Sequence, residues 1–204
     1  MWLSRVVLVL LAIVFEIVSY SKGYQIRIRF DDDEIFSDCR DQLDGVLNIS
    51  GVWDLTELTI ESQSDQIKVS GNTTSVWDIQ LTDRVVGSID VYKFYRREWV
   101  PTIYKINVPD VCSTMYDKNQ YWYSLWTQYI TNADDIKDKC INVRGVKYIH
   151  RPFILKDLQF NNQMTTVEGP HKIQIQLKAF NVFGKLRPTS ICFELKAYFE
   201  TKFI

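Results

Sequence analysis

The stretch "KIQIQLKAF", Lys172 to Phe180, alternates polar and apolar residues along its whole length. A period of two residues is typical of a β-strand that buries one face and leaves the other in water. The buried face is predicted to carry Ile173, Ile175, Leu177 and Ala179. The opposite face is predicted to carry Lys172, Gln174, Gln176 and Lys178. The stretch therefore predicts a half-buried strand.

A second stretch near the end of the chain repeats this alternation. "CFELKAYFE", residues 192–200, places Phe193, Leu195, Ala197 and Phe199 on one face. The segment between the two stretches, residues 181–190, contains Gly184 and Pro188, which are typical turn residues. The two stretches are therefore predicted to form an antiparallel pair joined by a turn.

Similar short alternating runs fill the rest of the chain and are separated by turn residues. Further strands are predicted at 24–30, near 52–60, and at 66–70, 76–81, 87–96, 102–108, 145–151 and 153–160. Many short strands with turns between them favour an antiparallel β-sandwich or β-cup. The fold class is therefore expected to be mainly β.

The first residues have the pattern of a secretory signal peptide. Arg5 precedes an apolar run from Val6 to Val18 that is too short to span a bilayer, and small serines stand before a cut after Ser21. Cleavage would leave 204 − 21 = 183 residues, with no membrane-spanning segment and a net charge of −1. Residues 1–21 are thus expected to be a signal peptide and 22–204 a single secreted domain.

The cysteines and two sequons agree with a secretory route. The four cysteines, Cys39, Cys112, Cys140 and Cys192, are an even number and include no C-x-x-C pair, so two structural disulfides are expected. Spacing alone does not choose among the three possible connectivities. The sequons "NIS" and "NTT" predict glycosylation at Asn48 and Asn72 and place both in solvent.

One aromatic segment breaks the period of two residues. In "YWYSLWTQYI", residues 121–130, a helical period places Trp122, Leu125, Trp126 and Tyr129 on one side. Asp117 and Gln120 resemble a capping box, and Asn132 is expected to end the helix in left-handed geometry. A short amphipathic helix over about 118–131 is therefore predicted; a strand would leave no clean polar face.

The sequence offers little that resembles a catalytic or metal centre. Its two histidines, His150 and His171, lie outside any zinc or nucleophile motif and are read as surface or strand-end residues. The run "FDDDE" at 30–34 lacks the spaced ligands of a calcium loop and is read as solvated charge. No enzyme activity, metal or other cofactor is expected, and without clustered cations no nucleic-acid partner is expected.

A pair of arginines allows two interpretations. In "YRREW", Arg96 and Arg97 stand beside Trp99 and could contact an anionic head group. Charge that guards the edge of a sheet is the more common meaning of such a pattern.

The C-terminal half resembles the ganglioside activator protein and its relatives. The resemblance is carried by a cysteine before a Gly-x-x-Tyr-like turn and by a hairpin that passes through Gly-Lys into a final cysteine-bearing strand. The matching positions are Cys140, Gly145, Tyr148, Gly169, Gly184, Lys185 and Cys192. Earlier matches are Cys39, Gly71, Asn72 and Thr74. Within that family, the length, the four cysteines and the ending "EGPHKIQIQLKAFN…RPTSICFE" most resemble insect chemosensory proteins of the CheB type.

This resemblance implies a lipid-recognition β-cup, which is a sandwich splayed open to hold acyl chains, with a helix near its mouth. It also implies the pairs Cys39–Cys192 and Cys112–Cys140, whereas the activator protein has four bridges. The expected ligand is a lipid or a hydrocarbon such as a pheromone, and a chemosensory receptor or ion channel is a further candidate partner.

The candidate residues for binding an apolar ligand come from the final strands and the aromatic segment. They are Trp122, Leu125, Trp126, Tyr129, Ile173, Ile175, Leu177, Phe193 and Leu195. Three alternatives remain open: these side chains fill a closed core, the chain is an extracellular interaction module that modulates a receptor, or it presents lipid to a hydrolase.

Overall fold

The computed structural model describes residues 24–30, 35–40, 44–63, 66–155, 160–162 and 168–203. The described part of the chain is mainly β, with two antiparallel sheets and a few short helices. Within the described ranges no helix has the length and apolar character needed to cross a membrane. The predicted signal peptide and the run 31–34 lie outside the described residues.

The larger sheet has eight strands in the order β10-β1-β12-β11-β7-β8, and β2 and β3 also pair with β12. Its strands are β1 (Tyr24–Phe30), β2 (Ser37–Asp38), β3 (Val46–Leu47), β7 (Arg84–Tyr95), β8 (Glu98–Val108), β10 (Phe160–Asn162), β11 (Gly169–Phe180) and β12 (Leu186–Phe203). All of these pairings are antiparallel except that of β3 with β12.

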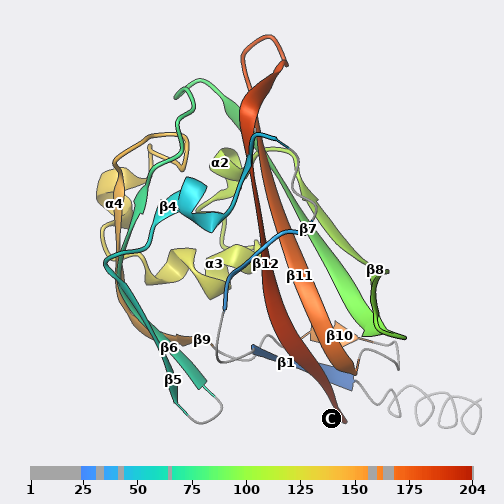
Figure 1. Cartoon of the computed structure of the whole chain (residues 1–204). Helices are drawn as coiled ribbons and strands as arrows, with labels where there is room; N and C mark the ends of the chain where they lie inside the picture. Colours follow the sequence, from blue (N-terminus) through green and yellow to red (C-terminus); the bar gives the residue numbers. More distant parts are fainter. Residues whose placement is uncertain are drawn as a thin grey trace, which may run out of the picture.

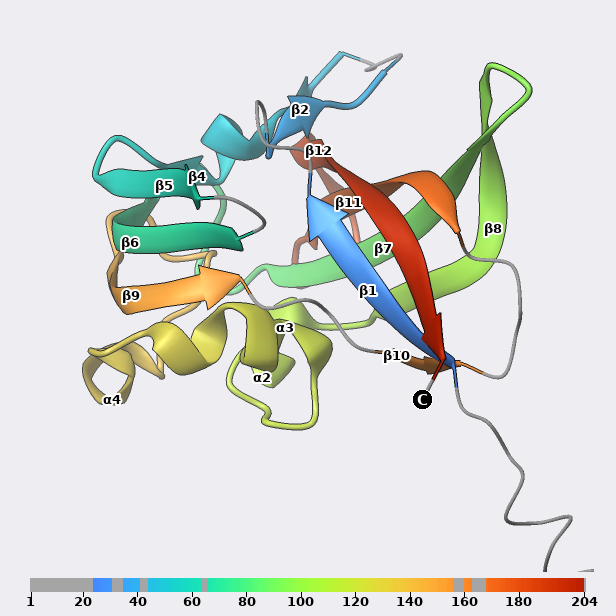
Figure 2. The same ribbon diagram turned by 90° about the horizontal axis from the view of Figure 1, so that it is seen from below.

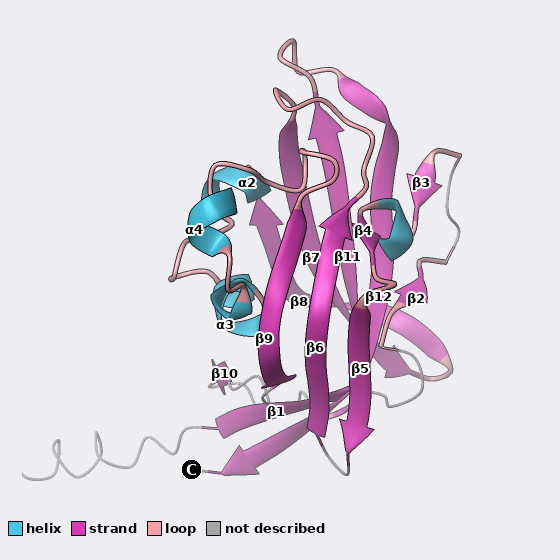
Figure 3. Cartoon of the chain, turned by 90° about the vertical axis from the view of Figure 1, so that its left-hand side faces the viewer, coloured by secondary structure: helices cyan, strands magenta, loops and turns pink. Residues whose placement is uncertain are grey.

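The smaller sheet has four strands and faces the larger one (Figure 1). Its strands are β4 (Trp53–Asp54), β5 (Leu58–Gln63), β6 (Gln66–Ser75) and β9 (Lys147–Leu155). The short helices are η1 (Ile49–Gly51), α2 (Val111–Thr114), α3 (Tyr121–Leu125), η2 (Thr127–Tyr129) and α4 (Ala133–Ile136). The segment that holds α2, α3 and α4 runs from the β8 edge of one sheet to the β9 edge of the other, along one side of the sandwich (Figures 2 and 3).

The antiparallel pair predicted from the alternating stretches is present as β11 and β12. Ile173 pairs with Leu195, and Ile175 pairs with Phe193. Because both members of each pair lie on the same face, the apolar halves of the two strands form one continuous surface. The predicted inward face of "KIQIQLKAF" is therefore the face that packs between the sheets.

The strand predicted at 76–81 is absent, and this segment is an irregular passage from β6 to β7. Its alternation has another cause: Trp77 is buried and donates from Nε1 to Thr189 Oγ1 at 3.1 Å. Asp83, just beyond, is also buried and accepts two hydrogen bonds of 2.8 Å from the Arg187 guanidinium. These hydrogen bonds hold the pKa of Asp83 below its usual value, and they fasten the passage to β12.

Two other predicted strand boundaries differ from the structure. The strand predicted near 52–60 is divided into β4 and β5. The strands predicted at 145–151 and 153–160 are joined in β9, which continues through Pro152 as far as Leu155; residues 156–159 of the second prediction lie outside the described residues. Among the described strands, β9 pairs with β6, and an isolated bridge joins its His150 to Ile130. The register with β6 shifts between Val69 and Gly71, opposite the proline. A proline is tolerated at such an edge because it lacks the N–H that an interior strand needs.

The two arginines singled out in the sequence form the two-residue turn between β7 and β8. Arg96 and Arg97 both have positive φ, 50° and 70°. This geometry matches the type I′ turn, whose twist suits an antiparallel hairpin. The Arg96 guanidinium lies over the Tyr95 ring at 5.2 Å.

Both disulfides pair as the family resemblance implies. Cys39–Cys192 joins the segment after β2 to β12, and Cys112–Cys140 joins α2 to the segment after α4. The second bridge therefore encloses the aromatic segment. The larger bridge ties residues that are 153 positions apart in the sequence.

Gly71 provides a test of the fold because two separate constraints require a glycine there. Its φ is +101°, and an added Cβ would lie 2.1 Å from the Glu57 carbonyl oxygen. We expect Gly71→Ala to lower the free energy of unfolding by about 3 kcal/mol or more, measured by urea denaturation. Gly145→Ala is the matched control, because Gly145 also has a positive φ (+84°) but has no atom within 4 Å of an added Cβ. Gly145→Ala should lower the free energy of unfolding by only about 1 kcal/mol. Equal losses for the two variants would contradict the close approach at Gly71.

Candidate functional site between the two sheets

The apolar interior of the described residues is divided into three clusters. The central cluster lies between the sheets and the helices and is built on Val52, Trp77, Val85, Met115, Ile130, Ile136, Cys140, Ile141, Val146, Tyr148, Ala179, Ile191 and Phe193. The β1–β12 cluster lies on the larger sheet and is built on Ile26, Ile28, Ile173, Ala197 and Phe199. The β6–β9 cluster lies on the smaller sheet and is built on Ile67, Val69 and Phe153.

Few side chains connect these clusters. Ile175 packs against both the central and the β1–β12 clusters. Phe30 packs against both the β1–β12 and the β6–β9 clusters. The interior therefore has one shared core and, beyond it, two apolar walls, one on each sheet.

The aromatic segment does not form the single helix predicted over 118–131. The helix α3 ends at Leu125, Trp126 has φ −141° and ψ −61°, and a 3-10 turn follows. The break buries Thr127, which a continuous helix would have placed on the polar side, and Thr127 Oγ1 donates to the Met115 carbonyl at 2.9 Å. Contacts with the rest of the fold thus override the helical period of the sequence.

The predicted caps of this helix also differ from the structure. Gln120 is the N-cap residue, and its side chain donates to the Asp117 carboxylate instead of closing a capping box on the backbone. Asn132 has φ −98° and is not left-handed. Its side chain instead donates to the Lys147 carbonyl and accepts from the Ile149 N–H, which attaches the helical segment to β9.

The break turns the aromatic rings of this segment toward different clusters. Trp126 packs edge-on against Trp53, with ring centroids 5.2 Å apart, and lies beside Tyr148 in the central cluster. Tyr129 stacks on Phe153 at 3.9 Å in the β6–β9 cluster. The segment thus reaches from the shared core to one of the walls.

The structure brings together most, but not all, of the predicted binding residues. The central cluster includes Trp126, Ile175, Leu177 and Phe193. The β1–β12 cluster includes Ile173, Ile175 and Leu195. Tyr129 belongs to the β6–β9 cluster. Trp122 and Leu125 are half-buried and belong to none of the three, and the Trp122 Nε1 donates to the Thr114 carbonyl.

Both histidines are buried, so the prediction that they are surface residues is wrong, although His171 is the third residue of β11 and lies near a strand end. His150 is 5% exposed and His171 is 1% exposed. Nε2 of His150 lies 3.1 Å from Thr73 Oγ1, and its ring lies beside Trp126. His171 stacks on Phe199 at 4.1 Å in the wall of the larger sheet.

Several buried polar atoms of the interior have no hydrogen-bond partner among the described residues. They include the hydroxyls of Tyr116 and Tyr148 and the Nδ1 atom of His150. Burial raises the pKa of Tyr116 to about 12, aided by the charge of Asp138, and it also raises the pKa of Tyr148. Burial lowers the pKa of His150 to about 4. All three groups are therefore neutral near pH 7 and can offer hydrogen bonds inside an apolar space.

The sequons lie on the outside of the sandwich. Asn48 precedes η1, and its Oδ1 accepts from the Ser50 N–H. Asn72 lies on β6 next to buried Thr73, and its Nδ2 donates to the Glu57 carboxylate at 2.8 Å. Both asparagines are half-exposed.

Within the described ranges, no three His, Cys, Asp or Glu side chains gather into a group that could hold a metal ion. A comparison of the chain with protein-family models and with curated proteins finds no match.

The buried His150 predicts how stability depends on pH. The unfolded chain protonates this histidine near its ordinary pKa of 6.5, whereas the folded chain does so only near 4. Between these values the unfolded state binds a proton that the folded state does not, so the free energy of unfolding falls as pH is lowered. The His150 contribution to the loss between about pH 7 and pH 5 should be about 2 kcal/mol.

This contribution is measured by urea denaturation of the wild type and His150→Gln at both pH values. His171 remains in both proteins, so its own lowered pKa cancels from the comparison. The variant should lose less stability than the wild type on acidification. The same loss in both proteins would show that His150 is not held neutral by burial.

Proposed function

We propose that this chain is a secreted, non-enzymatic binding protein whose lipid or other hydrophobic ligand lies between the two sheets. The observation that carries the proposal is the division of the interior into a shared core and two apolar walls. A domain of this size usually has one contiguous core with small satellite clusters. Here the two satellite clusters lie on facing sheets, which is an arrangement that suits a long apolar ligand.

The driving force for binding is transfer of apolar surface from water. Each methylene group that moves into the interior contributes about 0.8 kcal/mol. The walls supply branched aliphatic and aromatic side chains such as Ile173, Leu195 and Phe153. No catalytic group is needed for this activity.

We also propose that the bound ligand serves chemosensory perception, for example of a pheromone. This part rests on the resemblance of the cysteine pattern and of the last two strands to the chemosensory members of the ganglioside activator-like family. The disulfides Cys39–Cys192 and Cys112–Cys140 are the pairs that this resemblance implies. Two disulfides are compatible with an extracellular protein.

Native mass spectrometry of the secreted protein, purified without detergent, tests the ligand-binding function. We expect co-purifying lipid, or uptake of added oleic acid or a long-chain alkene. Leu195→Phe should reduce the ligand-bound fraction because the larger ring occupies space along the wall of the larger sheet. Tyr198→Phe, which changes an exposed residue of the same strand, is the matched control and should retain the ligand.

The free energy of unfolding of both variants, measured in parallel, separates loss of ligand from loss of fold. A wild-type protein that carries no lipid and takes up neither probe would contradict the proposed function.

A second candidate function, an extracellular interaction module, is favoured by one surface feature. The turn between β11 and β12 exposes Phe183 (90%) and Val182 (68%) at its tip, which projects at the top of Figure 1. The turn is tightly bonded, because Asn181 Oδ1 accepts from the N–H groups of Phe183 and Lys185. A well-bonded turn that presents an aromatic ring to solvent is suited to docking on another protein.

The double variant Val182→Ser with Phe183→Ser tests this second function. Because both side chains are exposed, the free energy of unfolding should change by no more than about 0.5 kcal/mol. If the tip docks on a chemosensory receptor or channel, the variant should lose binding to cells that display it, as measured with fluorescently labelled protein. Binding equal to that of the wild type would show that the tip is not a docking site.

A further inference from the structure

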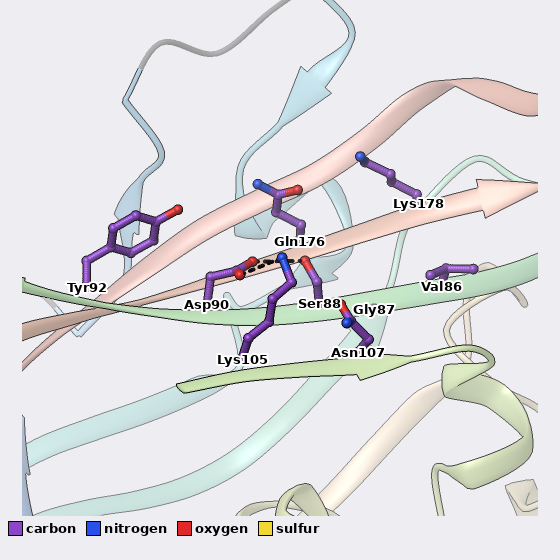
Figure 4. A pocket seen from close by; sticks show the side chains of 9 residues that line it. All are labelled: Val86, Gly87, Ser88, Asp90, Tyr92, Lys105, Asn107, Gln176 and Lys178. Atoms are coloured by element: carbon purple, nitrogen blue, oxygen red, sulfur yellow. Dashed lines mark hydrogen bonds and ion pairs between the residues drawn. The ribbon is translucent and has the colours of Figure 1, made fainter. Parts of the chain in front are cut away.

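A polar trough crosses the outer face of the larger sheet, opposite the apolar interior. Its volume is about 420 Å3, and it is lined by Val86, Gly87, Ser88, Asp90, Tyr92, Lys105, Asn107, Gln176 and Lys178 (Figure 4). The floor comes from β7, and the walls come from β8 and β11. None of the predicted binding residues lines it, so the trough is separate from the site between the sheets.

The register of the three strands explains the shape of the trough. Ser88 on β7 pairs with Asn107 on β8 and with Gln176 on β11. A short side chain therefore lies between two longer amide side chains. Adjacent strands lie about 4.8 Å apart, so β8 and β11 are separated by about 9–10 Å. That separation is comparable with the width of a single six-membered ring and its substituents.

Three of the lining side chains have unused hydrogen-bonding capacity. Within the part of the chain that the structure describes, the amides of Asn107 and Gln176 and the ammonium of Lys178 have no side-chain hydrogen bond or ion pair. By contrast, Asp90 is already fixed: its carboxylate binds Lys105 at 2.8 Å and accepts from Ser88 Oγ at 3.3 Å. The trough thus combines a preformed ion pair with unpaired donors and acceptors.

The end of the trough opposite Lys178 is held rigidly (Figure 4). The Tyr92 ring lies 5.0 Å from the Lys172 ammonium, which in turn forms a 2.7 Å ion pair with Glu194. Both of these charged side chains are nearly buried, at 8% and 5% exposure. The position of the Tyr92 ring is therefore fixed before any ligand arrives.

The chemistry of the trough selects a class of ligand. Apart from Val86 and the Tyr92 ring, its walls are polar, which does not suit a lipid. The charge of Lys105 is neutralised by Asp90, so Lys178 is the one lining cation without an ion-pair partner. A single lysine would bind a phosphate group only weakly. Hydroxyl groups both donate and accept, so they match amides, a carboxylate and ammonium groups together.

The geometry points to a second binding site in this trough, for a saccharide ring. The amides of Asn107 and Gln176 form hydrogen bonds to the ring from opposite sides. Asp90 accepts hydrogen bonds from its hydroxyls, and Lys178 donates one to a ring or hydroxyl oxygen. This site does not depend on the proposed ligand between the sheets.

The test is a titration of the isotope-labelled, secreted protein with galactose, mannose and N-acetylglucosamine, followed by the NMR shifts of backbone amides. At least one of these sugars should shift the amides of Ser88, Asn107 and Gln176 in a saturable manner. Asn107→Ala and Gln176→Ala should each weaken that binding about 5–10-fold, since each removes hydrogen bonds to a neutral partner. Lys196→Ala, on the same face but outside the trough, is the matched control and should leave binding unchanged.

Inorganic phosphate, titrated separately, distinguishes a sugar site from an anion site. Shifts at the trough with phosphate and with none of the sugars would overturn the saccharide assignment. It would also be overturned if no sugar shifted these amides, or if both alanine variants bound the sugar as tightly as the wild type.

Discussion

The register between β11 and β12 is the constraint on which the rest of the structure depends. It places Ile173 opposite Leu195 and Ile175 opposite Phe193, so that the apolar residues of both strands face the smaller sheet. A slip of one residue would turn the lysines and glutamines of β11 inward and the whole apolar set outward. β2 reinforces this register, because the pairing of Asp38 with Phe193 places Cys39 beside Cys192. In the chain-entropy model, a bridge that closes so long a loop contributes roughly 5 kcal/mol.

Much of the fold could be predicted from the sequence wherever one face of a strand is buried and the other is exposed to solvent. β1, β7, β8 and β11 lie within four residues of their predicted positions, because burial on one side produces a period of two residues in the sequence. β12 begins six residues earlier than predicted, at Leu186, so the turn before it is shorter than expected. The failures occur where burial follows another geometry. Around Trp77 the buried and exposed side chains alternate because the chain passes around the edge of the core, not because it forms a strand. At Trp126 the helical period is interrupted because the side chains on either side of the break pack into different clusters.

The site could be predicted less completely, because alternation shows that a strand has two faces but not always which of them is inward. On β9, Ile149 is 42% exposed whereas His150 is 5% exposed, which reverses the order that hydrophobicity suggests. The pairing of β9 with β6 determines which face of β9 is buried, and the sequence of neither strand alone predicts that pairing. The outer trough was missed for a similar reason. Each of its strands shows only an ordinary polar face, and the hollow arises when the short side chain of Ser88 lies between those of Asn107 and Gln176.

The polar atoms of the interior narrow the class of ligand that the proposed function can use. Burying a hydroxyl or ring nitrogen without a partner costs about 1–3 kcal/mol, so a ligand that extends from the walls to the Tyr148 hydroxyl in the central cluster and to the His150 Nδ1 would gain by bonding to them. Both can act as donor or acceptor. The Tyr148 hydroxyl rotates, and either tautomer of neutral His150 is satisfied at Nε2 because the Thr73 hydroxyl can also donate or accept. A saturated hydrocarbon would leave both atoms unbonded, whereas a long chain that carries a hydroxyl, carbonyl or carboxyl group would bond to them. Within the proposed function, an oxygenated lipid is therefore a better match to this interior than a plain alkane of the same length.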